Sequence, residues 1–244
     1  NRSNVEKAAK KLAWGKLVNA GQTCIAPDYI LVQEDVHDAF VLHFKEQVKR
    51  LFYNGENKTD SASYGRMINE HHFKRINSLI EGAVKDGAKI EMGGNADLKS
   101  LTIEPTMLTS VDLSSKIMDE EIFGPVLPVI SYSKIADAIR FINEKDKPLA
   151  LYIFDNSNET KQILQQTSSG GVCVNDVLIH ISNPNLPFGG VNSSGIGSGH
   201  GFYGFKSFSH ERAVVFQSKI DFTSMVYPPY EKKNWVLRLL KRII

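Results

Sequence analysis

Cysteine, long apolar runs and net charge are all scarce in this sequence. Its only cysteines, Cys24 and Cys173, lie far apart and form no CxxC pair, so we expect no disulfide framework and a reducing, cytoplasmic setting. No apolar stretch reaches the roughly 18 residues of a membrane span, and no secretory signal is recognisable. The net charge of +2, without a dense basic patch, argues against a nucleic-acid partner.

The remaining composition is that of an ordinary globular protein, with 42% hydrophobic and 23% charged residues, which argues against disorder. A length of 244 residues is enough for one large domain or two small ones. The histidines include the adjacent pair His71 and His72, which cannot share one face of a helix. No cysteine–histidine spacing of a zinc site occurs, so we expect no metal centre.

Hydrophobic periodicity predicts an alternation of helices and strands along the chain. Helices are expected at residues 4–19, 36–52, 71–87, 135–145 and 158–170, and strands at 29–33, 88–94, 103–111, 126–132, 149–154 and 171–176. After residue 125 the alternation is strict, which is typical of βαβ units. We therefore predict an α/β fold with a mostly parallel open sheet and flanking helices.

Two further segments follow this pattern. Residues 207–217, SFSHERAVVFQ, read as a late β segment that suits an interface edge. Residues 234–244, NWVLRLLKRII, place Trp235, Leu239 and Ile243 at helical spacing with Lys and Arg between them. We expect this tail either to pack as a helix or to make a peripheral contact with a membrane surface, since it is too short to span a bilayer.

One cysteine stands in a setting that favours chemistry. In GKLVNAGQTC, residues 15–24, the helical pattern stops at Gly21, and glycine is the residue that most readily takes the left-handed conformation at a helix end. Cys24 comes just beyond it, and a thiol on such a turn is a candidate nucleophile. The alternative is that Cys24 is a small buried hydrophobic residue.

Three motifs together carry a resemblance to a known family. GQTC at 21–24, EEIFGPVLPV at 120–129, and LPFGGVNSSGIG followed by GHGFYGFKSFSH at 186–210 resemble, in this order, the motifs of the aldehyde dehydrogenase superfamily, class 3 branch for fatty and aromatic aldehydes. The resemblance covers nearly the whole chain. It implies a catalytic domain at residues 1–205, without the cofactor-binding domain, and a C-terminal oligomerisation strand and tail helix at 206–244.

The resemblance also implies an activity and roles for individual residues. Cys24 would attack an aldehyde to give a thiohemiacetal, pass a hydride to NAD or NADP, and leave a thioester for water to hydrolyse. Glu121 matches the glutamate that binds ribose hydroxyls, because a carboxylate can accept two hydrogen bonds from a diol, and Phe123 would pack near the nicotinamide. The alternatives are an exposed acidic turn for Glu121 and ordinary core packing for Phe123.

A second group of residues is expected at the aldehyde pocket. Asn175, Asp176 and Val177 follow a predicted strand, and ligands collect beyond the carboxyl ends of strands in open α/β sheets. Phe188 resembles an aromatic wall of the aldehyde tunnel, and His200 either lines the pocket or makes a structural hydrogen bond. The GxGxGxG run at 195–201 lacks the strand and helix of a dinucleotide fingerprint, so we do not assign it to phosphate binding.

By the same resemblance, the acid–base glutamate, the oxyanion-hole asparagine and most of the cofactor domain belong upstream of the cysteine helix. We therefore expect a fragment of a homodimeric enzyme that is inactive alone. Two alternatives stay open. A cysteine hydrolase would need His200 or His180 as a base beside Cys24, and a non-catalytic dimerisation module would act through residues 207–217.

Overall fold

The computed structural model describes residues 2–54, 59–60, 62–155, 157–221, 223–231, 233, 235 and 238. The chain divides into two compact units, one that runs to Phe208 and one from Ser209 onward. The predicted functional division at residues 205 and 206 stays a prediction. No helix among the described residues has both the length and the apolarity needed to cross a membrane.

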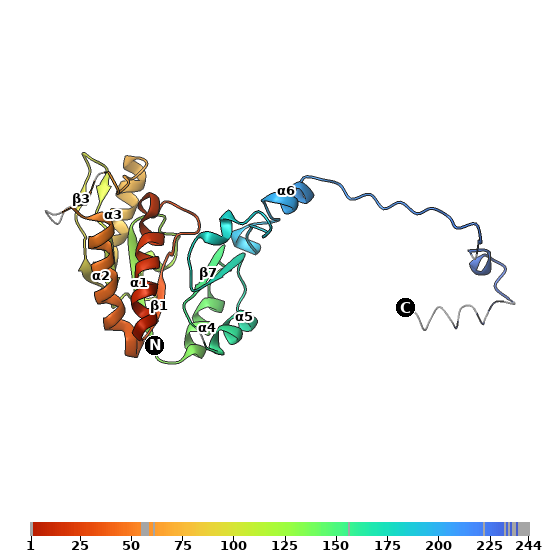
Figure 1. Ribbon diagram of the computed structural model, residues 1–244, viewed down its shortest axis with the longest axis horizontal. Coiled ribbons are helices and arrows are strands. Elements are labelled where there is room, and N and C mark those ends of the chain that lie inside the picture. The colour runs from red at the N-terminus through yellow and green to blue at the C-terminus, as the bar shows by residue number, and fades with distance from the viewer. Residues whose placement is uncertain are drawn as a thin grey trace. The chain divides into compact units, whose positions relative to one another are not determined.

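The first unit is built from alternating helices and strands, as the periodicity predicts (Figure 1). Its helices are α1 Arg2–Leu17, α2 His37–Phe52, α3 Glu70–Lys85, α4 Ile135–Glu144, α5 Glu159–Gln166 and α6 Gly201–Ser207. Its strands are β1 Ile30–Gln33, β2 Lys89–Met92, β3 Ala96–Asp97, β4 Thr102–Ile103, β5 Thr106–Thr109, β6 Val126–Tyr132, β7 Ala150–Ile153 and β8 Gly171–Val174.

The main sheet has the strand order β1-β6-β5-β2. The β1–β6 and β5–β6 pairs are parallel, whereas β2 joins the edge of β5 antiparallel. Strands β7 and β8 form a separate parallel pair, and β3 and β4 a short antiparallel one. The prediction of a mostly parallel α/β sheet with flanking helices is therefore confirmed, although the strands are shared among three sheets.

Both faces of the main sheet are covered because neighbouring strand residues point to opposite sides. Met107 of β5 and Leu127 of β6 pack into the cluster that holds the buried faces of α1 and α2. Leu108 and Val126, their neighbours in sequence, pack instead with α3. Burial on both faces explains why β6 reads as a nearly continuous apolar run.

Two predicted strands differ from the structure for clear physical reasons. The stretch 103–111 is divided between β4 and β5 by Pro105, since proline has no N–H for a sheet ladder. The predicted strand at 207–217 is wrong for this chain, because α6 ends at Ser207 and residues 210–218 have no regular structure. A strand needs a partner for its backbone N–H and C=O groups, and the sheets of the described residues do not include this segment.

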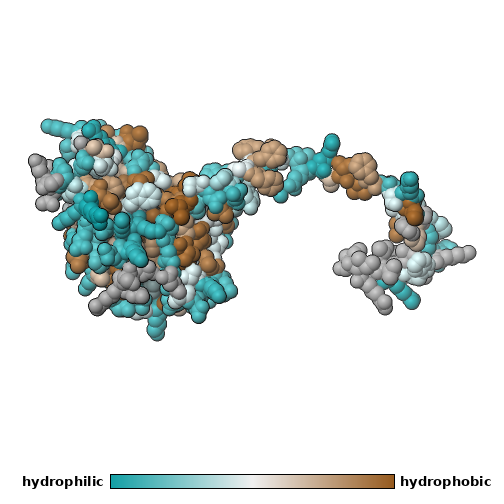
Figure 2. Space-filling model, viewed as in Figure 1, coloured by the Kyte–Doolittle hydropathy of each residue, from teal (hydrophilic) through white to brown (hydrophobic). Residues whose placement is uncertain are grey.

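The segment that follows α6 leaves large apolar side chains in solvent. Val215 and Phe216 are each 90% exposed, and Figure 2 shows brown, hydrophobic patches along this extended stretch. Apart from Trp235 and Arg238, the predicted tail helix at 234–244 lies outside the described residues.

Candidate active site

Cys24 sits on a turn that the end of α1 forces into an unusual backbone conformation. Asn19, Ala20 and Gly21 all have positive φ, at 52°, 53° and 74°. A Cβ on Gly21 would lie 2.2 Å from the carbonyl oxygen of Gly124, so glycine is required both by its φ and by the close approach of the two backbones. Cys24 follows three residues later, and its thiol is exposed. The expectation of a glycine-ended helix with an accessible cysteine is confirmed.

The EEIFGP loop is held beside this turn from two sides. Arg75 of α3 donates to the carbonyl oxygens of Glu121, at 3.1 Å, and Ile122, at 2.5 Å. The Ile122 N–H donates to the Asp28 carboxylate at 3.0 Å, and Asp28 lies four residues after Cys24. Two sequence motifs that are about 100 residues apart therefore meet in space.

Cys24 and Glu121 line the same groove. The groove has a volume of about 1330 Å³ and runs between β1 and β7. Among the described residues β1 pairs with β6 alone and β7 with β8 alone, so the groove separates the main sheet from the β7–β8 pair. The thiol and the carboxylate thus open into one space, large enough for a small molecule.

The pKa values of Glu121 and Lys16 are both shifted from their ordinary values. Desolvation, and then the negative charge of Asp28, raise the pKa of Glu121, while Arg75 and Lys16 oppose the rise. Lys16 is 1% exposed, and its burial lowers its pKa to about 8 against the attraction of Asp28 and Glu121. A cation buried near two carboxylates offsets part of their mutual repulsion.

The loop after β8 is fixed to α1. Lys11 of α1 donates to the Asn175 carbonyl oxygen at 2.9 Å and to the Asp176 carboxylate at 2.6 Å. Asn175, with φ of 57°, also donates its side-chain amide to the Asp155 carbonyl oxygen. Desolvation raises the pKa of Asp176, but the hydrogen bonds from Lys11 and from the Val177 backbone outweigh it and lower the pKa overall. These two residues therefore hold the loop in place.

The structure places Val177 and Phe123 in different environments. Val177 is fully buried in the core, so close to α1 that a Cβ on Gly15 would lie 2.6 Å from it. Phe123 is half-buried and has a φ of 47°, which is rare for a bulky residue. Their predicted roles, at the pocket border and near the nicotinamide, stay predictions.

Phe188 and His200 form a stacked pair. Their ring centroids are 5.3 Å apart and their planes differ by 18°, and the backbones of Phe188 and Gly199 exchange hydrogen bonds of 3.3 and 2.7 Å. His200 is exposed with a φ of 69°. The two residues that the sequence assigns to the aldehyde pocket are thus brought together as one aromatic surface.

The hydrolase alternative gains no support from the histidines. The Nδ1 of His180 lies 3.2 Å from the Sγ of Cys173, the buried cysteine, and His200 stacks on Phe188. Among the described residues no side chain hydrogen-bonds to the Cys24 thiol. No group of three or more metal-ligating side chains occurs within the described part of the chain.

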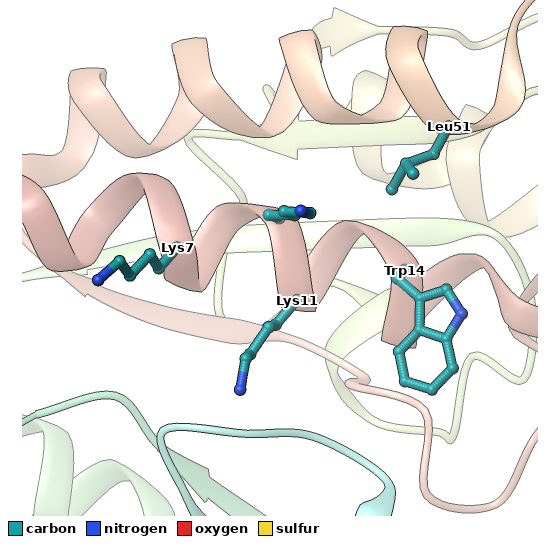
Figure 3. A pocket seen from close by; sticks show the side chains of 5 residues that line it. Lys7, Lys11, Trp14 and Leu51 are labelled. Carbon is teal, nitrogen blue, oxygen red and sulfur yellow. The ribbon is translucent and has the colours of Figure 1, made fainter.

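Sequence reasoning missed Arg75, Lys16 and Lys11. The signal for Lys16 was present, because it follows Leu12 by four residues in the apolar stripe of α1. Lys11 also borders a smaller pocket of about 430 Å³, which it lines with Lys7, Lys10, Trp14 and Leu51 of α2. Figure 3 shows the side chains of Lys7, Lys11 and Trp14 projecting from α1.

The sequence matches the aldehyde dehydrogenase family over residues 1–214. The chain belongs to the aldehyde dehydrogenase family. It is 47% identical over 237 residues to aldehyde dehydrogenase family 3 member A2 of Rattus norvegicus, covering 95% of this chain and 48% of the relative. It is 43% identical over 233 residues to the dimeric NADP-preferring aldehyde dehydrogenase of the same species, covering 94% and 50%.

A solved aldehyde dehydrogenase has the same fold. The structure of Staphylococcus aureus AldH in a substrate-bound state superposes with a TM-score of 0.87 at 39% identity, covering 97% of this chain and 51% of that one. The chain thus spans about half the length of the relatives that it matches.

The residues present fit the nicotinamide end of a dinucleotide. Glu121 lines the groove that holds Cys24 and carries two acceptor oxygens, and Arg75 fixes its backbone. This donor set suits a ribose diol. The glycines at 195–201 lead into the short helix α6, which begins at Gly201, so the expectation that no helix follows them is wrong. The element that precedes them among the described residues is a 3₁₀ helix and not a strand, and their exclusion from phosphate binding stays a prediction.

Proposed function

We propose that the protein to which this chain belongs oxidises aldehydes to carboxylic acids, with NAD or NADP as the electron acceptor and Cys24 as the covalent nucleophile. The observation that carries the proposal is the exposed Cys24 thiol just beyond the left-handed residues 19–21, in one groove with Glu121. Family membership supports the reaction class. The relatives are about twice as long, so the activity is proposed for the whole protein.

Cys24 performs the chemical steps that this chain can supply. Its thiolate adds to the aldehyde carbon and forms a C–S bond, and the carbonyl oxygen becomes an oxyanion that the Cys24 backbone N–H can stabilise. The nicotinamide coenzyme, when bound, supplies the acceptor for the hydride. Loss of the hydride leaves a thioester on Cys24. Water then attacks that carbon, the C–S bond breaks, and the acid leaves while the thiolate is restored.

The other site residues bind and orient the coenzyme and the aldehyde. Glu121 accepts hydrogen bonds from the ribose hydroxyls, and Phe123 packs beside the nicotinamide. Phe188 and His200 give the aldehyde an apolar, aromatic wall, which suits a fatty or aromatic carbon chain. Asn175, Asp176 and Val177 hold the loop that borders this wall.

We further propose a homodimer and a cytoplasmic setting. The exposed apolar residues after α6, with no strand partner among the described residues, support a second copy of the chain as the partner. The two free thiols suit a reducing compartment.

Peripheral membrane contact by residues 234–244 is the weaker proposal. Vesicle co-sedimentation that is unchanged on deleting these residues would contradict it.

The test is turnover of hexanal and benzaldehyde by the complete protein, with NAD and NADP in turn. We expect Cys24→Ser to lower kcat by about 10³-fold or more, since serine is a far weaker nucleophile. Cys173→Ser is the matched control and should keep most of the activity. The isolated 244-residue chain should show no turnover. Wild-type rates in Cys24→Ser would overturn the assignment of the nucleophile.

A further inference from the structure

A tyrosine of β7 reaches the turn that carries the nucleophile. The hydroxyl of Tyr152 donates to the carbonyl oxygen of Ile25 at 2.7 Å, between residues 127 positions apart. The Ala26 N–H donates to the Thr23 carbonyl oxygen at 2.9 Å, so Cys24 and Ile25 are the two central residues of a four-residue turn. Tyr152 therefore holds this turn at the residue that directly follows Cys24.

The same hydroxyl also contacts the loop after β8. A hydrogen bond from the Leu178 backbone lowers the pKa of Tyr152, but desolvation outweighs it and raises the pKa well above its usual value. The hydroxyl thus stays protonated at neutral pH and remains a donor to Ile25. A phenol can donate one hydrogen bond and accept another, so one oxygen joins the cysteine turn to the loop of Asn175 and Asp176.

The ring of Tyr152 continues toward the aromatic wall. It lies edge-on to His180, with centroids 6.1 Å apart. His180 lies 5.9 Å from Phe188, and Phe188 stacks on His200. The contact between His180 and the Cys173 thiol fixes the middle of this series. Tyr152 therefore contacts the residue after Cys24 through its hydroxyl, and through its ring it contacts His180, which in turn contacts the Phe188–His200 pair.

We propose that Tyr152 is a positioning residue, which sets the place of the Cys24 thiol relative to the Phe188–His200 wall. The proposal rests on the proposed function, since an aldehyde held on this wall must present its carbonyl carbon to the Cys24 sulfur. Reacting atoms need to be placed to within about 1 Å, because a misplacement of that size can lower a rate about 100-fold.

The chain offers a matched control for the hydroxyl. Tyr64 is buried, and its hydroxyl donates at 2.8 Å to the carbonyl oxygen of Ile103 in β4, not to the Thr23–Ala26 turn. Tyr152→Phe and Tyr64→Phe each remove one tyrosine–carbonyl hydrogen bond and keep the ring. A general loss of stability should affect both variants, whereas a positioning effect should appear in Tyr152→Phe alone.

The experiment measures alkylation of Cys24 in the 244-residue chain by mass spectrometry, with peptide mapping to separate Cys24 from the buried Cys173. Iodoacetamide and N-benzyl iodoacetamide are compared, and the quantity of interest is the ratio of their rates. This ratio cancels changes in thiol ionisation, because both reagents react with the same thiolate, and it rises when the aromatic wall guides the benzyl group to the sulfur. We expect a ratio of about 10 for the parent chain and for Tyr64→Phe, and a ratio near 1 for Tyr152→Phe.

A second variant keeps the test decisive if Tyr152→Phe does not fold. Phe188→Leu removes the wall and keeps the hydroxyl, and it should lower the same ratio while the iodoacetamide rate stays unchanged. Equal ratios in the parent chain, Tyr152→Phe and Phe188→Leu would overturn the proposal. In the complete protein, Tyr152→Phe should lower kcat about 10-fold with little change in KM.

The alkylation ratio needs neither coenzyme nor turnover. If the complete protein has no dehydrogenase activity, the proposed function is refuted. The alkylation ratios still test the positioning role of Tyr152 independently of that result.

Discussion

Cys24 and Cys173 lie in the same α/β unit, but their surroundings are opposite. Cys24 is exposed on an irregular turn that opens into a large groove, whereas Cys173 is buried within β8 against His180. Burial raises the pKa of the Cys173 thiol, although a hydrogen bond from the His180 backbone opposes the rise. Burial also lowers the pKa of His180. The contact between the buried side chains of Cys173 and His180 is thus a neutral packing contact, and the exposure of Cys24 supports the proposal that it is the nucleophile.

The largest effect should come from breaking the left-handed turn at residues 19–21, which precedes Cys24. Gly21→Ala forces a side chain into a positive-φ position, 2.2 Å from a backbone oxygen, so we expect a loss of at least about 3 kcal/mol in the free energy of unfolding. Gly82→Ala is the control. A Cβ there meets nothing within 4 Å. Alanine in place of this helical glycine should therefore raise the free energy of unfolding by roughly 0.5–1 kcal/mol. Urea denaturation of both variants checks this, and equal changes would contradict it.

The contrast between the thiols can be measured directly. In the native chain, iodoacetamide should modify Cys24 at least about 100-fold faster than Cys173, because Cys173 reacts only when its strand opens locally. Peptide mapping after timed alkylation gives both rates. In 6 M guanidinium chloride the difference should disappear. Equal native rates would mean that β8 is open.

Replacing Lys16 tests how a buried charge near Asp28 and Glu121 affects the stability of the chain. Lys16→Met removes a buried charge and should stabilise the chain by about 2 kcal/mol at pH 7. Its folded pKa of about 8 lies below the ordinary value of 10.5. Between these values the unfolded chain binds more protons than the native one, so stability of the parent chain rises with pH.

The difference in stability between the parent chain and Lys16→Met should accordingly become smaller as the pH rises from 8 to 10. Thermal melts at pH 7, 8, 9 and 10 measure it. Lys10→Met, at an exposed position on the same helix, should change stability by less than about 0.5 kcal/mol throughout. A stability difference between the parent chain and Lys16→Met that stays constant with pH would show that Lys16 is not buried as a charge.

The smallest effect is expected in the loop after the Cys173 strand. Asp176→Asn breaks the charge pair with Lys11, whose two side chains are 28% and 41% exposed, so the loss should stay below about 1 kcal/mol. The pKa of Asp176 is lowered, so its contribution is present at neutral pH and is lost as the pH falls through the folded value. The difference between parent and variant should therefore vanish in acid, and a difference that persists at pH 2 would argue against the pair.

Much of the fold followed from local pattern. The apolar spacing of α2 and α3 and the βαβ alternation after residue 125 predicted helices and strands to within a few residues. The exceptions needed partners or neighbours that a sequence does not display. Residues 207–217 have strand-like alternation, yet a strand forms only where another chain segment accepts its hydrogen bonds. The site residues were found through motifs, but the roles of Glu121 and Phe123 in binding stay predictions.

The sequence by itself determined the α/β character, the glycine at the end of the cysteine helix and the order of the family motifs, whereas the exposure of Cys24 came from the structure. These are local properties, since φ preferences and hydrophobic periodicity act over a few residues. Only the tertiary structure decided that Arg75 fixes the Glu121 loop, that Lys16 is buried beside two carboxylates, and that the Tyr152 hydroxyl reaches Ile25. The two hydrogen bonds join residues 46 and 127 positions apart, and packing of the whole unit is what brings them within hydrogen-bonding distance.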